Sequence, residues 1–369
     1  MSKRVWRNFD FLLLGVTIVI ASIGIALIYS ATISTEGNIE LLGRSFFRQI
    51  QFAVSGLLIL LLVSAIDYHL LGSVHWLVYI VAIGILGLVA VVGQTGFGAQ
   101  SWLSLRRGVQ PSELSKVLMI VFLAKYLADH EEEMHKLQWV LFSAMLMIPP
   151  LFLIYRQPDL GTAIVLAAIW IGMVFAGGAR FLHLGLLGIG AAAVAPIAWF
   201  SLKDYMRQRI LVFLNPASDI SGISYNARQA LISVGSGGWF GKGFLHGTQS
   251  QLYFLRVRHT DYVFSVLGEE LGFVGAIVLL LFFLILFWRI LRAASLARDA
   301  FGRLIVCGVA TMIFSQSFIN IAVNVNLLPV TGLTLPLVSY GGSSLWVTLL
   351  GLGLVENVVM RRKKLEFGV

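Results

Sequence analysis

Residues 271–288 read LGFVGAIVLLLFFLILFW, an apolar run without a charged side chain. With the residues before it, the run is long enough for a membrane helix, which needs about 20 apolar residues to cross the hydrocarbon core. Similar runs recur along the chain, and we predict an all-α polytopic membrane protein of about ten transmembrane helices. The predicted spans lie near residues 11–31, 47–66, 72–93, 111–129, 138–155, 161–178, 182–202, 261–288, 303–328 and 335–360.

The composition supports this fold class. Of 369 residues, 58% are hydrophobic and only 12% are charged, whereas soluble domains carry about 25% charged residues. The first apolar run is long enough to span and has no small-residue cleavage site after it, so we expect no cleavable signal peptide. We therefore expect residues 1–369 to form a single membrane domain.

Basic residues gather in three places, and their positions predict the orientation of the chain. With ten spans, all three clusters and both termini fall on one side of the membrane, which the positive-inside rule makes cytoplasmic. The single cysteine, Cys307, can form no intramolecular disulfide and does not reveal the compartment. The clusters comprise Lys3, Arg4 and Arg7; Arg289, Arg292, Arg298 and Arg303; and Arg361, Arg362, Lys363 and Lys364.

The same orientation places residues 203–260, between the seventh and eighth predicted spans, outside the cytoplasm as one long loop. Its net charge is +5, because Asp204 and Asp219 oppose seven basic residues. Two interpretations remain open: the loop is too long to obey the positive-inside rule, or it forms an electropositive vestibule for an anionic ligand, which we favour. The basic residues are Lys203, Arg207, Arg209, Arg228, Lys242, Arg256 and Arg258.

The loop is also expected to contain helices. Residues 205–214 can form an amphipathic helix on the membrane surface, ended by Asn215-Pro216, and a second helix is expected at 225–234. The run Gly235–Gly243 holds five glycines in nine residues around Lys242. Glycines let a backbone approach a phosphate closely, but the spacing is not that of a Walker motif, so the run indicates phosphate binding only weakly.

Several ionisable residues lie where a charge is costly, within or beside the predicted spans. Glu113 and Lys116 share one face of the fourth span, either as a self-neutralising pair or as functional groups. Asp159 is expected either to cap the sixth span or to face a substrate. Asp261 stands beside cationic residues where the loop meets the eighth span, and it either caps that helix or contributes to a site for the headgroup of an amphiphile.

Deeper polar residues extend this pattern. Glu269 lies about 12 Å further into the eighth span than Asp261, near the same face, whereas Glu270 points the other way and is expected to pack or hydrogen-bond. Amides of the ninth span either join helices or line a cavity; they are Gln316, Asn320, Asn324 and Asn326. Residues 336–344 (PLVSYGGSS, including Ser343) start the tenth span, where irregular backbone indicates a cavity wall. The histidines show no close ligand pair, so no zinc site is predicted.

Several of these motifs occur in a familiar order, and the chain resembles the SEDS family of bacterial cell-wall proteins, named for shape, elongation, division and sporulation. The resemblance covers nearly the whole chain. The stretch HGTQSQ at 246–251 and the short termini favour the RodA branch. The motifs are QPSELSK at 110–116, QPDLGT at 157–162, YMRQR at 205–209, GKGFLHGTQSQ at 241–251, HTDYVF at 259–264, GEELG at 268–272 and PLVSYGGS at 336–343.

The resemblance implies peptidoglycan glycosyltransferase activity that polymerises lipid II at the outer face of the bacterial cytoplasmic membrane. It also implies a class B penicillin-binding protein as partner. The family's essential aspartate matches Asp261, and its important acid and lysine match Glu113 and Lys116. The chain departs from many relatives at Arg256-Val257, where they have Pro-Glu. It departs again at Ser101-Trp102, where they have arginine before the tryptophan. Arg106 or Arg107 is a candidate to supply that second charge.

This chemistry suits the residues present. An acceptor 4-hydroxyl displaces polyprenyl pyrophosphate from the donor C1, so one carboxylate base and cations around the leaving group suffice. We expect Asp261 to be that base or to hold the acceptor oxygen in place, and Glu113, Asp159 and Ser343 to bind substrate. A Mg²⁺ or Mn²⁺ ion could assist, although the sequence does not require one. Candidates for the diphosphate are Lys116, Arg207, Arg209, Lys242 and Arg258.

Two other classes of function stay open. A transporter that flips lipid II would also use many spans, buried polar residues and a basic vestibule, but the inner halves of most spans are apolar and no inverted repeat is evident. A non-catalytic scaffold for a penicillin-binding protein would leave Asp261 and the basic loop unexplained. Lipid II, membrane lipids and that partner are therefore the expected ligands, and no nucleic acid is expected.

Overall fold

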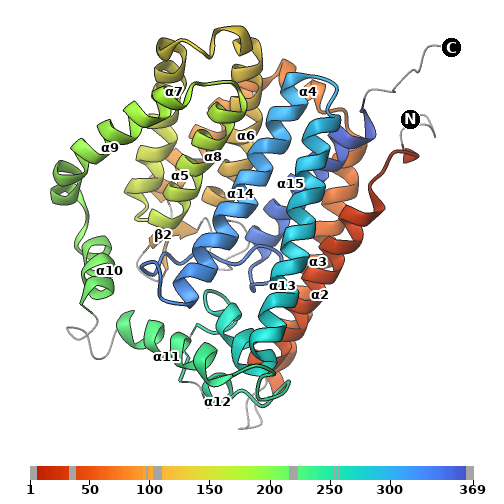
Figure 1. Ribbon diagram of the computed structural model, residues 1–369, viewed down its shortest axis with the longest axis vertical. Helices are drawn as coiled ribbons and strands as arrows, with labels where there is room; N and C mark the ends of the chain where they lie inside the picture. The colour runs from red at the N-terminus through yellow and green to blue at the C-terminus, as the bar shows by residue number, and fades with distance from the viewer. Residues whose placement is uncertain are drawn as a thin grey trace.

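A computed structural model shows an elongated bundle of helices with a group of shorter helices at one end (Figure 1). It describes residues 6–32, 39–92, 94–96, 99–102, 110–215, 223–252, 254–255 and 257–362. Helices occur at all ten positions predicted from the apolar runs. The all-α prediction is confirmed except for a small antiparallel hairpin, β1 (Gln94–Gly96) and β2 (Ala99–Trp102).

The helices that coincide with the predicted spans are bounded as follows: α2 (Phe11–Thr32), α3 (Ile39–Ala65), α5 (His75–Val92), α6 (Pro111–Asp129), α7 (Leu137–Arg156), α8 (Leu160–Ala176), α9 (Phe181–Ser201), α13 (Val263–Leu296), α14 (Ala300–Asn324) and α15 (Gly342–Met360). The shorter elements are α4 (His69–Ser73), η1 (Glu131–Glu133), α10 (Asp204–Leu214), α11 (Ile223–Ser236) and α12 (Thr248–Gln251).

Length and hydropathy make the chain a multi-pass membrane protein. Six helices are long and apolar enough to cross a membrane, namely α2, α3, α7, α13, α14 and α15. Three more, α5, α8 and α9, are apolar but shorter. Helix α6 is long enough but not apolar enough, since Glu113, Lys116, Lys125 and Asp129 lower its hydropathy. The number of crossings therefore stays a prediction.

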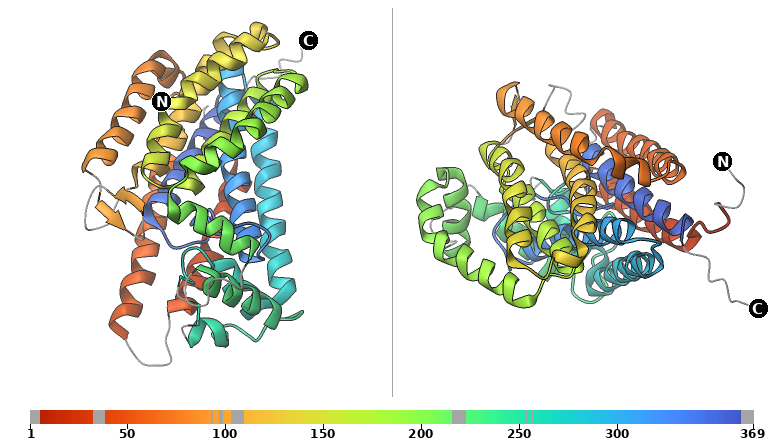
Figure 2. Two further views of the ribbon diagram at one scale, coloured as in Figure 1. Left: turned by 90° about the vertical axis from the view of Figure 1, so that its left-hand side faces the viewer. Right: turned by 90° about the horizontal axis from the view of Figure 1, so that it is seen from above.

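The bundle has an inner and an outer set of helices, which Figure 2 shows from the side and from above. Helix α14 contacts α6, α8, α13 and α15, and the most apolar stretch of α15 is 89% buried. The corresponding stretch of α3 is only 22% buried, although it packs along α15. A helix that is apolar all round and yet exposed suits contact with lipid.

The structure corrects three helix boundaries. The third predicted span is divided at Val74 into α4 and α5. Helix α13 continues to Leu296 but is broken at Gly272, whose backbone is not helical (φ 66°, ψ −163°). The tenth helix begins at Gly342 and not at residue 335, because the backbone between these positions is not helical: Leu337 has φ +67°.

Both helices expected within residues 203–260 are present, as α10 and α11. Helix α11 packs against α13 and α14, so the segment is a folded cover over one end of the bundle. The two chain termini lie at the opposite end (Figure 1). Asp219, Arg106, Arg107 and Arg256, which the sequence analysis considered, lie outside the described residues.

Candidate functional site

Asp261 lies on the turn that leads into α13, and the residue is partly exposed. Two amides of α14 hold this turn: Asn320 Nδ2 and Asn324 Nδ2 each donate to the Asp261 carbonyl at 2.9 Å. Asn324 Oδ1 in turn accepts from the Ser265 backbone N at 3.0 Å and from Ser265 Oγ at 2.7 Å. Because these amides are buried, they fix the position from which the Asp261 carboxylate projects.

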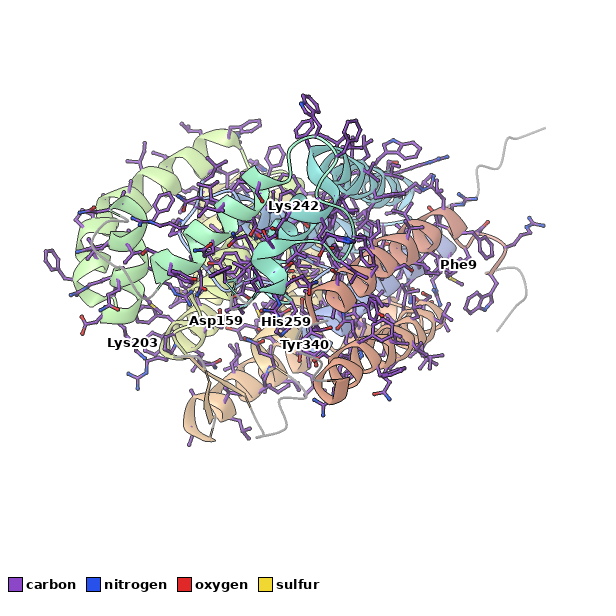
Figure 3. The ribbon with its side chains drawn as sticks, turned by 90° about the horizontal axis from the view of Figure 1, so that it is seen from below. Phe9, Asp159, Lys203, Lys242, His259 and Tyr340 are labelled. Carbon is purple, nitrogen blue, oxygen red and sulfur yellow. The ribbon has the colours of Figure 1, made fainter. Side chains whose placement is uncertain are left out.

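The connection from α14 to α15 runs alongside this turn. Tyr340 N donates to the His259 carbonyl at 2.8 Å, and the Ser339 hydroxyl donates to the Thr260 carbonyl. The rings of His259 and Tyr340 lie 5.5 Å apart, and Figure 3 shows them side by side at this end of the molecule. The irregular residues 335–341 therefore form part of the wall around Asp261.

Arg209 of α10 reaches the same place. Its Nη1 donates to the Val330 carbonyl at 3.1 Å. A Cβ on Gly332, where φ is +76°, would lie 3.8 Å from Arg209 Nη1 and 4.0 Å from Asp261 Oδ2. Gly332 thus leaves open a small space that both the guanidinium and the carboxylate face.

Burial and the charge of Arg209 determine the ionisation of Asp261. Burial raises the pKa of Asp261 to about 6, while the charge of Arg209 and a hydrogen bond from the Thr260 side chain lower it. Burial, and then the charge of Arg258, lowers the pKa of His259 below its usual value. At neutral pH, Asp261 is therefore largely ionised and His259 is neutral.

A second polar group lies at the start of α6. Lys116 Nζ donates to Glu113 Oε1 at 2.7 Å, and neither side chain is more than 8% exposed. The geometry is that of the self-neutralising pair considered from the sequence. Its burial at the N-terminal end of α6 keeps the positive and the negative charge together.

Asp159 is the N-cap of α8, which is one of the two roles predicted for it from the sequence. Its Oδ1 accepts from Thr162 N at 3.0 Å, and its Oδ2 accepts from Thr162 Oγ1 at 2.8 Å. Weaker bonds come from Ser112 Oγ at 3.3 Å and Gln110 Nε2 at 3.4 Å. The Gln110 backbone N donates to Ser343 Oγ at 2.8 Å. Gln110 therefore joins the starts of α6, α8 and α15.

All five cations predicted for a diphosphate bond to protein groups, Lys116 and Arg209 in the ways described above. Arg207 donates to the carbonyls of Trp199 and Phe200, at the end of α9. Arg258 is buried and donates to the Ala31 carbonyl at the end of α2. Lys242 pairs with Glu269 at 2.8 Å. Of the predicted cations, Arg209 is the one whose charge lowers the pKa of Asp261.

The glycine-rich run has a structural use that explains its composition. It docks on the break in α13, where Lys242 N and Gly243 N donate to the carbonyls of Glu269 and Glu270, and Phe273 N donates to the Gly238 carbonyl. A Cβ on Gly241 would lie 2.1 Å from the Glu270 carbonyl oxygen. The glycines thus let two backbones meet and satisfy the polar groups that the break exposes.

Some residues around Asp261 could not be recognised, or could not be fully interpreted, from the sequence. Asn320 and Asn324 were noted, but their bonds to Asp261 were not. Gln110 was quoted only as part of a motif, although its place before Pro111 at a helix start is a signal for a cap. Gly332 carried no signal of its own. Among the residues that the structure describes, no group of His, Cys, Asp and Glu could hold a metal ion.

These features define a class: a multi-pass membrane protein with a partly accessible carboxylate and an arginine held at one end of its helix bundle. The chain belongs to the FtsW/RodA/SpoVE family, whose model, described as cell cycle protein, matches residues 10–364.

Relatives are similar over almost their full length. The peptidoglycan glycosyltransferase MrdB of Escherichia coli is 38% identical over 347 residues, which cover 93% of each chain. Stage V sporulation protein E of Bacillus subtilis is 36% identical, over 95% of this chain and 96% of its own.

Solved structures share the fold. One chain, from a peptidoglycan synthase complex described as coordinating polymerization and crosslinking, matches with a TM-score of 0.79 and 33% identity, covering 95% of this chain and 97% of that one. The rod shape determining protein RodA of Thermus thermophilus matches with a TM-score of 0.70 and 31% identity, covering 97% and 99%.

Proposed function

We propose that this protein is a peptidoglycan glycosyltransferase that polymerises lipid II into glycan strands during cell elongation and shape maintenance. Relatives of 38% and 30% identity carry the name peptidoglycan glycosyltransferase. The observation that carries the proposal is the placement of Asp261, which is partly exposed, faces the same space as Arg209 and is fixed through its backbone by two buried amides.

In the proposed reaction Asp261 accepts the proton of the acceptor sugar's 4-hydroxyl. The oxygen forms a bond to the donor C1 with inversion, and the bond to polyprenyl pyrophosphate breaks with its electron pair leaving on the diphosphate. Arg209 stabilises that departing charge. A positioned base contributes about 10²–10⁴-fold. Asp261 is therefore the residue whose loss should affect turnover most directly.

The remaining predicted substrate residues shape the surroundings. Glu113, Lys116, Asp159 and Ser343 bond mainly to each other and to neighbouring helix starts, which supports a role in forming the wall that substrate meets. Lys242, Arg207 and Arg258 are held against protein groups and support the same end from further away. Among the described residues no group of three or more His, Cys, Asp and Glu could hold a metal ion, and we propose the reaction without a step that uses Mg²⁺ or Mn²⁺.

The proposed orientation places the end with both termini in the cytoplasm and the end with Asp261 at the outer face of the bacterial cytoplasmic membrane. Arg289, Arg292, Arg361 and Arg362 lie near the termini, and a positive cytoplasmic side is typical of membrane proteins. In this arrangement the chain crosses the membrane ten times as one domain, and residues 203–260 form an extracytoplasmic cover.

A class B penicillin-binding protein that crosslinks the new glycan is the proposed partner. The support comes from the similar chain in a complex that coordinates polymerization and crosslinking. The flippase alternative is not favoured, because the relatives are named as glycosyltransferases.

The test is polymer formation from labelled lipid II by purified protein with its partner, whose transpeptidase is blocked. We expect glycan ladders from wild type and from Asp204→Asn, whose side chain is 95% exposed, but not from Asp261→Asn. The partner alone serves as a blank. Ladders from Asp261→Asn at more than a tenth of the wild-type rate would refute the assignment of the base. No ladders from a wild-type sample that binds lipid II would refute the polymerase.

A further inference from the structure

A polar pocket lies at the end of the molecule opposite Asp261, between residues 7–10, which directly precede α2, and the last turns of α13 and α15. No step of the proposed reaction uses it. Arginines from three separate segments line it. The lining comprises Arg7, Asn8, Phe9, Asp10, Arg289, Arg292, Leu296, Val359 and Arg362.

Of the acids near this pocket, Asp10 is engaged and Glu356 accepts through one of its two carboxylate oxygens, whereas its Oε1 has no partner among the described residues. Asp10 Oδ2 accepts from Arg289 Nε at 2.9 Å, and the Asp10 backbone N donates to Glu356 Oε2 at 3.0 Å. Among the described residues, no carboxylate lies within 4.0 Å of the guanidinium groups of Arg7, Arg292 and Arg362. The pocket therefore presents an excess of positive charge, which suits an anion.

Exposed aromatic residues adjoin the pocket. The Trp288 ring is 54% exposed and lies 5.4 Å from Arg289 Cζ and 5.8 Å from Arg292 Cζ. On the other side, the ring of Phe9 lies 5.2 Å from that of Phe11, which is 72% exposed. Tryptophan is typical of the level of lipid headgroups, and an exposed phenylalanine offers apolar surface to acyl chains. A charged pocket with an apolar rim suits a molecule with an anionic head and an acyl tail.

We propose that this pocket binds the phosphate of an anionic phospholipid of the cytoplasmic leaflet, whose acyl chains lie against Phe11 and Trp288. The ligand is a lipid and not free phosphate, because the rim offers apolar contact that an inorganic ion cannot use. The inference rests on the proposed orientation of the chain but not on the proposed reaction. Basic pockets at the cytoplasmic ends of membrane helices are suited to such headgroups.

The test uses the whole protein in detergent, titrated with phosphatidylglycerol or phosphatidylcholine and observed by native mass spectrometry. We expect tighter retention of phosphatidylglycerol. Each arginine near an anionic lipid contributes about fivefold to binding, so Arg292→Gln with Arg362→Gln should weaken phosphatidylglycerol retention by about 25-fold. Arg180→Gln is the matched control, since Arg180 is exposed at the same end but does not line the pocket.

Three results would overturn the proposal: equal retention of both lipids by wild type, equal loss in the control and the double variant, or displacement of the lipid by millimolar inorganic phosphate. Size-exclusion profiles of the variants show whether they fold. Polymerisation of lipid II is measured separately on the same samples. A wild type that polymerises without retaining anionic lipid would reject this site alone and leave the proposed reaction standing.

Discussion

Asp261 and Glu269 lie eight residues apart at the start of α13, yet their surroundings differ. Glu269 is fully buried, and its carboxylate accepts from Lys242 Nζ and Thr248 Oγ1 at 2.8 and 3.0 Å, and from the backbone N of Gln249 at 3.0 Å. Asp261 is partly exposed, and among the described residues its carboxylate has one side-chain hydrogen-bonding partner, Thr260, whose hydroxyl also donates to the Val257 carbonyl at 3.3 Å. One acid is saturated by the protein, and the other keeps lone pairs for a ligand.

The two nearby cations also have different partners. Lys242 is engaged by Glu269 and Thr248, whereas Arg209 donates to the Val330 carbonyl and lies beside Gly332, where its charge lowers the pKa of Asp261. A saturated pair stabilises the fold, since all its hydrogen bonds are made within the protein. An acid with free lone pairs and a raised pKa is suited to proton transfer. Glu269 and Lys242 therefore form a structural cluster, whereas Asp261 and Arg209 form a chemical one.

The largest effect is expected from a substitution at Gly272, where the break in α13 meets the glycine-rich run that carries Lys242. In Gly272→Ala, the new Cβ would lie 2.3 Å from Gly241 N and 2.7 Å from the Trp239 carbonyl oxygen, in a backbone conformation that only glycine adopts readily. We expect loss of folded protein, measured as the monodisperse peak in size-exclusion chromatography of solubilised membranes. Gly87→Ala is the control, since nothing lies within 4 Å of its Cβ. Equal peaks from both would contradict the account of the break.

The next effect tests the saturated acid. Glu269→Gln should lower the free energy of unfolding by about 2–3 kcal/mol, below the ~3–5 kcal/mol for breaking a fully buried pair, because Lys242 is 28% exposed and reaches water. Thermal unfolding in detergent measures the loss. The double variant Lys242→Met/Glu269→Gln should recover part of it.

Turnover per folded molecule should fall far less in Glu269→Gln than in Asp261→Asn. If Glu269→Gln were as inactive as Asp261→Asn while remaining fully stable, the division between structural and chemical acids would be wrong.

The sequence predicted the helices and the central acid because both signals are local. Apolar runs of membrane length identify helices wherever they stand, and the HTDYVF motif placed Asp261 at a helix start. Capping by Asp159 was also one of the predicted alternatives. All of these depend on residues within a few positions of one another.

The hydrogen-bonding partners of Asp261, Glu269 and Arg258 could not be predicted from the sequence, because they lie far away along the chain. Asn324 meets the Asp261 carbonyl across 63 positions, Lys242 meets Glu269 across 27, and Arg258 meets the Ala31 carbonyl across 227. Composition made all the basic residues of the loop equal candidates for a diphosphate. Only the three-dimensional arrangement distinguishes Arg209 from those that cap helices or pair with acids.

A smaller effect is expected from the amides that hold Asp261. Asn324→Ala removes the bond to the Asp261 carbonyl and the acceptor of Ser265 Oγ, at a cost of about 1–3 kcal/mol. We expect turnover to fall by about tenfold, because the turn loosens while the carboxylate remains. Gln316→Ala is the control on the same helix, since Gln316 Nε2 has no partner among the described residues. Equal turnover in the two variants would show that the amides only join helices.

An effect no larger than this is expected from pH, which tests Asp261 without a mutation there. Burial raises the pKa of Asp261 to about 6, and a base must be deprotonated to act, so the rate should fall as pH falls through 6. Between pH 7 and pH 5 the ionised fraction drops about tenfold, and so should turnover of lipid II. Arg209→Ala removes the cation that favours the ionised form, so the acid limb should move to higher pH. Arg207→Gln should leave its position unchanged, since Arg207 bonds to the end of α9. An acid limb that stays in place in Arg209→Ala would mean that Arg209 does not act on the titrating group, and the pairing of Arg209 with Asp261 would have to be abandoned.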